Sequence, residues 1–515
     1  MTHSREEVQA DRPDSLAHDH FGGRERLLVA LFCLVAALRV SLFTLAFPFF
    51  NNVDEQNHFD LVCKYSHGHI PRGLEPFGAE AAGFMALYHS PEYCWRLEDY
   101  PGGKTPSPVC SLSAAERAKL VPELTEGFRQ KVNFESAQMP LYYTLVGAWY
   151  NLGKLLGLEG GNLLYWTRFL NLPAYLAVVW LAYLFAKELL PKARFVYLGI
   201  PCILAVFPQD IFYCLSNDVL SAPFATLSLY LLLRLYRSET PRPGLALGAG
   251  LSAAAAVLTK FINPPLLVVV GIVACLKLVP AWWKKQPLVH LVPVLVLVAA
   301  AGIPVACWLA RNYVVFGDMT GYALNNRFKG WTPKPVSEYW RHPMFTPGGF
   351  AVFWSEFLRT FWRGQMRWHY TALAAGPIDT FYVLSSSLFL LAFAVAAIAN
   401  RGRMAAEARL FSGLGGLLFV LSLAILVLIS ISFDFGTSNY PSRRFPYLPC
   451  GRYLLGSLVP FLMMYLGGLE VLLDWLQLRW LRLPLLILMA SFMALSEISY
   501  SMQVFASHYN WYHLP

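Results

Sequence analysis

The chain is poor in charge: only 14% of its 515 residues are Asp, Glu, Lys or Arg, whereas 56% are hydrophobic. A water-soluble chain usually carries about 25% charged residues, so a surface that faces mainly water is excluded. Long uncharged segments recur along the chain, each near the ~20 residues that a helix needs to cross a bilayer. Backbone polar groups in lipid must be paired within their own segment, which predicts helices; a β-barrel would show short alternating strands.

Other features are missing too. Residues 1–26 hold no apolar segment, which argues against a cleavable signal peptide and predicts a disordered cytosolic tail. The net charge of +9 comes from scattered basic residues, so we expect no binding of nucleic acid. No nucleotide-binding signature and no internal repeat is evident. Among the nine cysteines, Cys94 and Cys110 flank a hydrophilic, Pro/Gly-rich stretch, and a disulfide between them stays open if that stretch is outside the cytosol.

The apolar segments predict an all-α polytopic membrane protein with about 11–13 transmembrane helices. The predicted spans are 27–50, 164–186, 194–213, 217–236, 244–261, 264–282, 288–312, 377–399, 407–433, 452–476 and 483–503. The stretch 139–158 is apolar as well, and whether it crosses, re-enters or lies flat stays open. Lys and Arg gather in the loops 186–194, 235–243, 282–286, 400–409 and 476–483, which places these loops in the cytosol by the positive-inside rule.

This orientation puts the loops near 51–137, 313–376 and 434–451, and the C-terminus, on the external side. The chain then divides into a tail (1–26), an N-terminal catalytic membrane module (27–312), an external aromatic-rich loop (313–376) and a C-terminal membrane module (377–515). In the third part, Phe350, Phe353, Trp354, Phe357 and Phe361 share one face of a predicted helix. That helix lies in the membrane interface or packs on the protein; the sequence favours neither.

The strongest chemical signal follows the first span, where Asp54, Glu55, His58 and Asp60 fall within seven residues. Such a cluster at a membrane boundary is costly unless it is hydrated or used. Polar and cationic residues also stand at other predicted external span ends, where the positive-inside rule should deplete Lys and Arg. They are Asn217, Asp218, Lys260, Arg311, Asn312, Arg443, Arg444 and Arg452.

Together these residues are of the types needed for transfer of a sugar from a phosphate carrier. The acceptor hydroxyl needs a general base, for which we select Asp54, with Glu55 beside it to orient the acceptor. The leaving phosphate needs positive charge, which Lys260 and the arginines supply. No cofactor is certain. A divalent cation on Asp54 and Glu55 stays open, because no spacing here is diagnostic of a metal site.

An ordered set of motifs carries a resemblance to the GT-C membrane glycosyltransferases, closest to a bacterial branch of predicted membrane proteins (DUF2142-like). The motifs are VDEQNHFD (53–60), QMPLYY (138–143), RFLNLPAYL (168–176), LSNDVL (215–220), LTKF (258–261), WLARNYVVFGD (308–318), LRTFWRGQMRW (358–368) and GRYLLGSLVP (451–460). Met139 stands where the family usually has a proline, and Gln56-Asn57 replaces a common Pro-Ala. Neither departure removes a charged group.

The resemblance implies a GT-C-like bundle in the bacterial cytoplasmic membrane, a cytosolic N-terminus and an active site on the periplasmic face. It also implies a polyprenyl-phosphate-linked sugar donor, an envelope glycan or lipid-linked acceptor, and a catalytic base in the first external loop, which is Asp54 here. Two other functions stay open: a flippase or transporter for lipid-linked sugars, and a non-catalytic partner in envelope-polymer assembly. Arg39, inside the first span, is predicted to form a structural pair with an unidentified partner.

Overall fold

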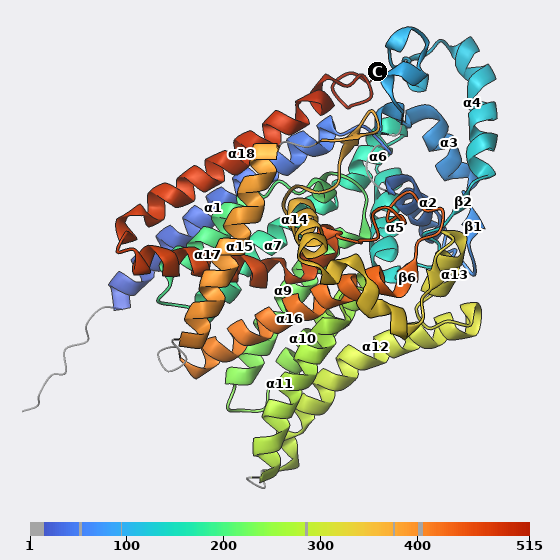
Figure 1. Cartoon of the computed structure of the whole chain (residues 1–515). Coiled ribbons are helices and arrows are strands. Elements are labelled where there is room, and N and C mark those ends of the chain that lie inside the picture. The colour runs from blue at the N-terminus through green and yellow to red at the C-terminus, as the bar shows by residue number, and fades with distance from the viewer. Residues whose placement is uncertain are drawn as a thin grey trace, which may run out of the picture.

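The computed structural model describes residues 15–50, 54–93, 95–283, 287–373, 376–399 and 405–514. Within them, helices form almost all of the regular structure, and the strands are three short pairs (Figure 1). The helices are α1 (Ser15–Ala46), α2 (Glu55–Ser66), α3 (Ala79–Tyr88), α4 (Ala114–Arg129), α5 (Pro140–Leu155), α6 (Gly160–Arg168), α7 (Asn171–Leu189), α8 (Arg194–Ala205), α9 (Ser221–Arg237), α10 (Pro243–Thr259), α11 (Pro264–Trp283), α12 (Val292–Phe316), α13 (Tyr322–Phe328), α14 (Pro347–Arg363), α15 (Gly376–Ala399), α16 (Ala406–Ser432), α17 (Leu458–Trp475) and α18 (Arg482–Ala506).

Eight helical segments of the described residues are long and apolar enough to cross a membrane. They are Gly23–Ala46, Gly160–Leu189, Asn217–Arg237, Leu288–Phe316, Gly376–Ala399, Ala406–Ser432, Gly451–Trp475 and Arg479–Ala506. Shorter apolar helices, Arg194–Ala205, Pro243–Thr259 and Pro264–Pro280, coincide with the remaining predicted spans. The all-α polytopic class is therefore confirmed.

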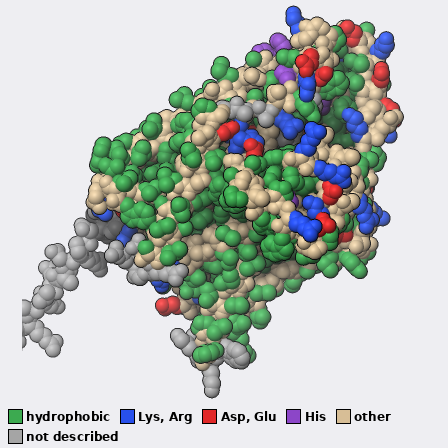
Figure 2. Space-filling model, in the orientation of Figure 1, with side chains coloured by type: hydrophobic (Ala, Val, Ile, Leu, Met, Phe, Trp, Pro, Cys, Tyr) green, Lys and Arg blue, Asp and Glu red, His purple; other side chains and the backbone are tan. Residues whose placement is uncertain are grey.

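One hydrophobic core joins the two predicted membrane modules, because a single cluster of buried side chains runs from Val29 on α1 to Val504 on α18. A second cluster lies around α2, α3, α5 and α6. These helices gather with α4 and α13 at one end of the bundle, where the C-terminus also lies, while α1 begins at the opposite end (Figure 1). We call this the loop-bearing end. Charged side chains gather there in the space-filling view (Figure 2).

Short antiparallel strand pairs hold the loops of this end together. Strand β1 (Glu75–Pro76) pairs with β2 (Val132–Asn133), which closes most of the first long loop on itself. Strand β3 (Thr332–Pro333) pairs with β6 (Phe433–Asp434), so the two later loops are joined although about 100 residues separate them in sequence. Strands β4 (Arg367–Trp368) and β5 (Thr371–Ala372) form a local hairpin.

The structure decides between the two readings of the aromatic helix. In α14, Phe353, Phe357 and Phe361 are buried at 0–1% exposure, so this face packs on the protein. Phe361 lies against Phe461 of α17, with ring centroids 4.5 Å apart. Only Phe350, at the start of the helix, is largely exposed. Of the two alternatives for the helix in residues 313–376, the interfacial helix is therefore wrong and the packed helix is correct, because the apolar stripe is covered by other helices.

The stretch 139–158 forms α5, which packs along α2 and is not among the candidate spans. The disulfide prediction lies partly outside the described residues, because Cys94 is not among them; Cys110 is buried.

The partner of Arg39 is Glu497 on α18. The guanidinium Nη1 donates to both oxygens of Glu497, at 3.0 and 3.1 Å, and Nε donates to the carbonyl oxygen of Ala205 at 3.0 Å. The Tyr213 hydroxyl lies between Arg39 and Glu497 and contacts both. This buried pair connects the first span to the last, as the cost of a lone charge inside a membrane protein requires.

Removing one partner leaves the other charge buried without compensation. We expect Arg39→Met to lower the free energy of unfolding by about 3–5 kcal/mol, and the Arg39→Met/Glu497→Met double variant to recover most of it. Thermal unfolding of the purified protein in detergent measures this. The matched control is Arg443→Met, whose solvent-screened pair with Asp434 should leave the unfolding temperature nearly unchanged. Equal losses in the single and double variants would contradict the structural pair.

Candidate active site at the loop-bearing end

A buried ion pair places the start of α2 on the bundle. Arg168, the last residue of α6, donates through Nε and Nη2 to the two oxygens of Glu55, both at 2.7 Å. Its remaining donors reach the carbonyl oxygens of Thr44, Phe47 and Pro48 at the end of α1. The Glu55 oxygens also accept the backbone N–H groups of Phe50 and Leu215, each at 2.9 Å. Every donor of a guanidinium is thereby used.

Glu55 is therefore part of the framework. Its exposure is 0%, and both of its oxygens are engaged by Arg168 and backbone donors. Glu55 therefore cannot orient an acceptor as we expected, because both of its oxygens are needed to pair with the buried Arg168 charge. The same geometry does not fit a divalent cation shared by Asp54 and Glu55. Among the described residues, no group of three or more His, Cys, Asp or Glu side chains is arranged to hold a metal ion.

Asp54 immediately precedes this anchor and is in a different environment. Its backbone is left-handed, with φ 63° and ψ 8°, a conformation that Asp and Asn tolerate better than most residues. Its carbonyl oxygen accepts the N–H groups of Asn57 and His58, whereas its carboxylate makes no capping hydrogen bond to α2. The carboxylate is 26% exposed and lies 3.6 Å from the Arg452 guanidinium. Asp54 thus presents an accessible carboxylate from a strained, fixed backbone.

Asp218 and Lys260 form the buried centre of the site. The short 3-10 helix Asn217–Leu220, which leads into α9, carries Asp218 at 1% exposure. Lys260, directly after α10, places its Nζ 2.9 Å from Asn217 Oδ1 and 3.3 Å from the Asp218 carboxylate. The Pro264 that begins α11 ends the turn after Lys260. The turn between α10 and α11 therefore places the ammonium group against the start of the segment that leads into α9.

Arg452 completes the cluster from the distant C-terminal part of the chain. It lies in the 3-10 helix Gly451–Ser457 before α17, and its Nε is 3.5 Å from Asp218 Oδ2. Its two carboxylate contacts, at 3.5 and 3.6 Å, are longer than the 2.7–2.9 Å of a charge-assisted hydrogen bond. Lys260 and Arg452 both lie over the ring of Tyr453. We call Asp54, Asp218, Lys260 and Arg452 the charge cluster.

The charge cluster holds buried polar atoms that its own contacts leave open. Asp218 Oδ1 and Arg452 Nε make ion-pair contacts at 3.3 and 3.5 Å, but neither atom forms a hydrogen bond among the described residues. A buried polar atom without a partner costs about 1–3 kcal/mol, and such sites in native proteins need an explanation. A ligand that carries both acceptor and donor atoms would satisfy them.

His58 lies next to the charge cluster on α2. Its Nδ1 is 2.8 Å from the Tyr143 hydroxyl of α5. Burial, and after it the charges of Lys260 and Arg452, lowers the pKa of His58 well below its usual value of about 6.5. The imidazole is therefore neutral at physiological pH and serves as a hydrogen-bonding group. Asp60, two residues further along α2, has a structural role: it pairs with Lys64 and accepts from Gly78 and Asn133.

The structure separates the other predicted cations from the charge cluster. Arg311 donates to Asn312 Oδ1 at 3.1 Å and to the carbonyl oxygen of Pro71, and it stacks on Trp308 and Phe316. It therefore fastens the first long loop to the end of α12.

Arg443 is paired with Asp434 at 2.9 Å on the exposed surface, and Arg444 beside it is also exposed. Both residues share a predicted loop with Arg452 but lie away from the site, because the backbone between Arg444 and Arg452 passes from the surface into the core.

The sequence analysis did not select several residues that lie in or beside the site. Arg168 stands at an external span end within a quoted motif, and the same positive-inside argument applied to Lys260 would have found it. Gln138 and Tyr143 fall in another quoted motif, and Gln138 Oε1 accepts from Asn217 Nδ2 at 3.2 Å. Asp210 has no motif. It is buried near Arg452, accepts the N–H of Gln365 at 3.0 Å, and burial raises its pKa to about 6.

Fold and site together define an integral membrane protein with a polar, partly open site at one end of a helical bundle. The chain belongs to the DUF2142 family of predicted membrane proteins, which matches residues 38–456. That range includes all the residues of the charge cluster and crosses the predicted domain boundaries. No curated protein matches the sequence.

Among solved structures, the chain is similar to the oligosaccharyltransferase of Archaeoglobus fulgidus, crystallised in complex with zinc and sulfate. The TM-score is 0.45 and the sequence identity 13%, over 91% of this chain and 53% of the other. The chain thus spans about half the length of that protein.

The two neighbouring carboxylates should respond differently to the same chemical change. We expect Glu55→Gln to lower the free energy of unfolding by about 3–5 kcal/mol, because Arg168 loses its buried counter-charge. Asp54→Asn should lower it by only about 1 kcal/mol, since the side chain is partly exposed, its contact with Arg452 is long, and Asp218 still balances that cation. Thermal unfolding in detergent compares them. Equal stability of the two variants would remove the framework role of Glu55.

His58 should make stability depend on pH. Its pKa is lower in the folded than in the unfolded state, so its neutral form contributes fully above about pH 6.5, and that contribution is lost as the pH falls below this value. We expect wild type to lose stability relative to His58→Gln between pH 7 and pH 5, by up to about 1.4 kcal/mol per pH unit. Unfolding temperatures of both proteins across this range test it. Parallel curves would show that His58 does not titrate on unfolding.

Proposed function

We propose that the protein is a membrane glycosyltransferase that transfers a sugar from a polyprenyl-phosphate donor to an envelope glycan or lipid-linked acceptor. The observation that carries the proposal is the charge cluster itself: an accessible carboxylate, Asp54, beside the buried cations Lys260 and Arg452. The resemblance of the motifs to GT-C enzymes supports the same reaction. The loop-bearing end is then the periplasmic face of a bacterial inner membrane.

In the proposed reaction, Asp54 accepts the proton of the acceptor hydroxyl. The acceptor oxygen forms a bond to the anomeric carbon of the sugar, while the bond between that carbon and the phosphate oxygen breaks. The electron pair leaves with the phosphate, and the configuration of the sugar inverts in this single displacement. The released phosphate monoester carries one more negative charge than the donor, so Lys260 and Arg452 stabilise the transition state more than the bound donor.

The loose geometry of Arg452 suits this role. Its 3.5–3.6 Å contacts with Asp54 and Asp218 leave the guanidinium able to form shorter bonds with a phosphate. Asp218 prevents two buried cations from standing without a counter-charge when no donor is bound. Glu55 and Arg168 act as positioning residues that hold the backbone of Asp54.

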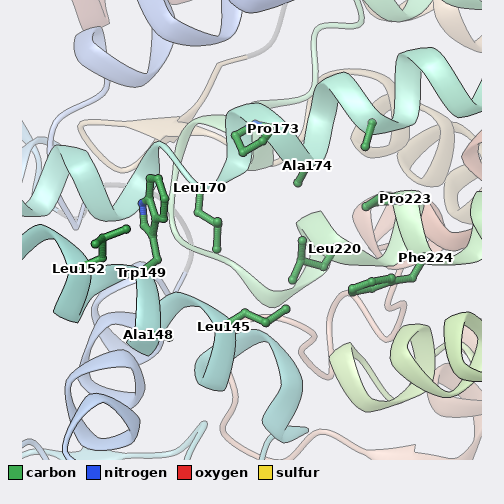
Figure 3. A pocket seen from close by; sticks show the side chains of 11 residues that line it. Leu145, Ala148, Trp149, Leu152, Leu170, Pro173, Ala174, Leu220, Pro223 and Phe224 are labelled. Atoms are coloured by element: carbon green, nitrogen blue, oxygen red, sulfur yellow. The ribbon is translucent and has the colours of Figure 1, made fainter.

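An apolar groove beside the charge cluster suits the hydrocarbon chain of such a donor. The groove has a volume of about 490 Å³ and is lined by apolar side chains of α5, α7 and the start of α9 (Figure 3). Leu220, on its wall, follows Asp218 by two residues. The groove walls from α7 and α9 belong to candidate membrane spans, which supports a lipid chain as its occupant.

The test is turnover by wild type and Asp54→Asn in lipid discs. Each protein receives a panel of polyprenyl-phosphate sugars and a crude envelope-glycan acceptor, and released polyprenyl phosphate is measured. We expect release by wild type and a loss of about 100-fold or more in Asp54→Asn, the usual range for a general base. Asp434→Asn, an exposed carboxylate of a neighbouring loop, is the matched control and should be fully active.

Normal turnover by Asp54→Asn would show that Asp54 is not the base. Donor binding without release by either protein would favour a transporter or an assembly partner. Movement of the donor across the membrane of a vesicle that contains the protein, without transfer of the sugar, would identify a transporter.

A further inference from the structure

Beside the charge cluster lies a second polar group that the proposed reaction does not use. Glu135 follows β2 and is only 7% exposed. One of its oxygens accepts from the Gln138 side-chain amide, and the other lies 4.0 Å from Lys329 Nζ, beyond a hydrogen bond. Its backbone N–H is held by Asn133 Oδ1 at 2.9 Å. The first long loop thus supplies a nearly buried carboxylate, of which one oxygen is hydrogen-bonded and the other has only a long contact with Lys329.

Hydrogen bonds connect this carboxylate to the proposed phosphate site. Gln138 Oε1 accepts from Asn217 Nδ2 at 3.2 Å, and Asn217 Oδ1 accepts from Lys260 Nζ at 2.9 Å. Glu135 is therefore connected to Lys260 of the charge cluster through Gln138 and Asn217.

Aromatic rings, an indole N–H and one side-chain amide complete this part of the site. Lys329 lies over the rings of Phe134 and Trp331, 4.8 and 5.5 Å from their centroids, and is 30% exposed. Within the described residues, the buried Trp331 Nε1 and Asn325 Oδ1 have no hydrogen-bond partner. An anchored carboxylate, an amide, an ammonium group and adjacent ring faces match a ring that carries several hydroxyls and apolar C–H faces.

Other ligands suit this group less well. A second phosphate would be repelled by Glu135, and a hydrocarbon chain would leave the carboxylate and the amides without partners. A sugar hydroxyl donates to Glu135 and accepts from Lys329 at the same time.

Resting on the proposed function, we propose that Glu135, Gln138 and Lys329 form the subsite that binds the hydroxyl groups of the donor sugar. The sugar is attached to the phosphate, so it must lie beside Lys260. The hydrogen-bonded chain Glu135–Gln138–Asn217–Lys260 connects the sugar subsite to the phosphate site. A site built to bond hydroxyls rejects analogues that lack them. The subsite therefore adds affinity for a carrier that bears a hydroxylated sugar over the bare carrier phosphate.

Binding of two probes separates this subsite from the phosphate site. Polyprenyl phosphate and polyprenyl phosphate carrying glucose, galactose, mannose or arabinose are titrated onto wild type and variants in detergent, and dissociation constants are measured by native mass spectrometry. We expect wild type to bind one sugar-bearing probe more tightly than polyprenyl phosphate. Glu135→Gln and Lys329→Met should each reduce that preference by about 10-fold, as expected for a lost bond to a charged group, and leave polyprenyl phosphate binding unchanged.

Controls make each failure distinct. Lys260→Met should weaken all probes equally, and Glu338→Gln, an exposed glutamate of the neighbouring loop, should alter none. The partly exposed Lys329 keeps the test valid if Glu135→Gln does not fold. No binding of polyprenyl phosphate by wild type would overturn the proposed function. Binding of polyprenyl phosphate with no gain from any sugar, or a gain that survives in both variants, would overturn the sugar subsite alone.

Discussion

The buried ion pair between Glu55 and Arg168 is the interaction on which the site depends. It joins the end of α1, the start of α2, the end of α6 and, through the N–H of Leu215, the segment that leads into α9. A guanidinium at 0% exposure is tolerated only because each donor has an acceptor. The pair therefore acts as a rigid junction. The pair also fixes the position of Asp54, because a residue directly before the anchored Glu55 has little freedom to move.

The charge cluster works differently from this junction. Arg168 makes short, saturated bonds, whereas Arg452 makes long contacts and leaves polar atoms open. Tight pairs give stability and specificity of position, while loose pairs leave charge available to a ligand. The pair of Arg39 and Glu497 is also buried and shares Tyr213, although Arg39 Nη2 has no hydrogen-bond partner among the described residues. The contrast between the saturated Arg168 and the loosely held Arg452 distinguishes framework from site at this end of the bundle.

Much of the fold followed from composition. Low charge, long apolar segments and the demand for internally paired backbone groups predicted each span, and the positive-inside bias predicted which loops share one end with the C-terminus. The same reasoning placed Asp54, Asp218 and Lys260 at external span ends. It left open whether α14 lies in the interface or packs on the protein, because a sequence stripe states that a face is apolar but not whether lipid or protein covers it; the burial of Phe357 answered that.

The sequence by itself determined that this is a helical membrane protein with a polar cluster at one end, because desolvation costs act on each segment independently of its neighbours. Only the tertiary structure decided which charges are free. Arg443 and Arg452 lie nine positions apart in one predicted loop, yet one pairs with Asp434 on the surface and the other enters the site. Glu55 and Asp54 are adjacent, yet Glu55 is fully paired with Arg168 whereas the Asp54 carboxylate stays accessible. Pairing depends on distances across the bundle, and local sequence does not contain them.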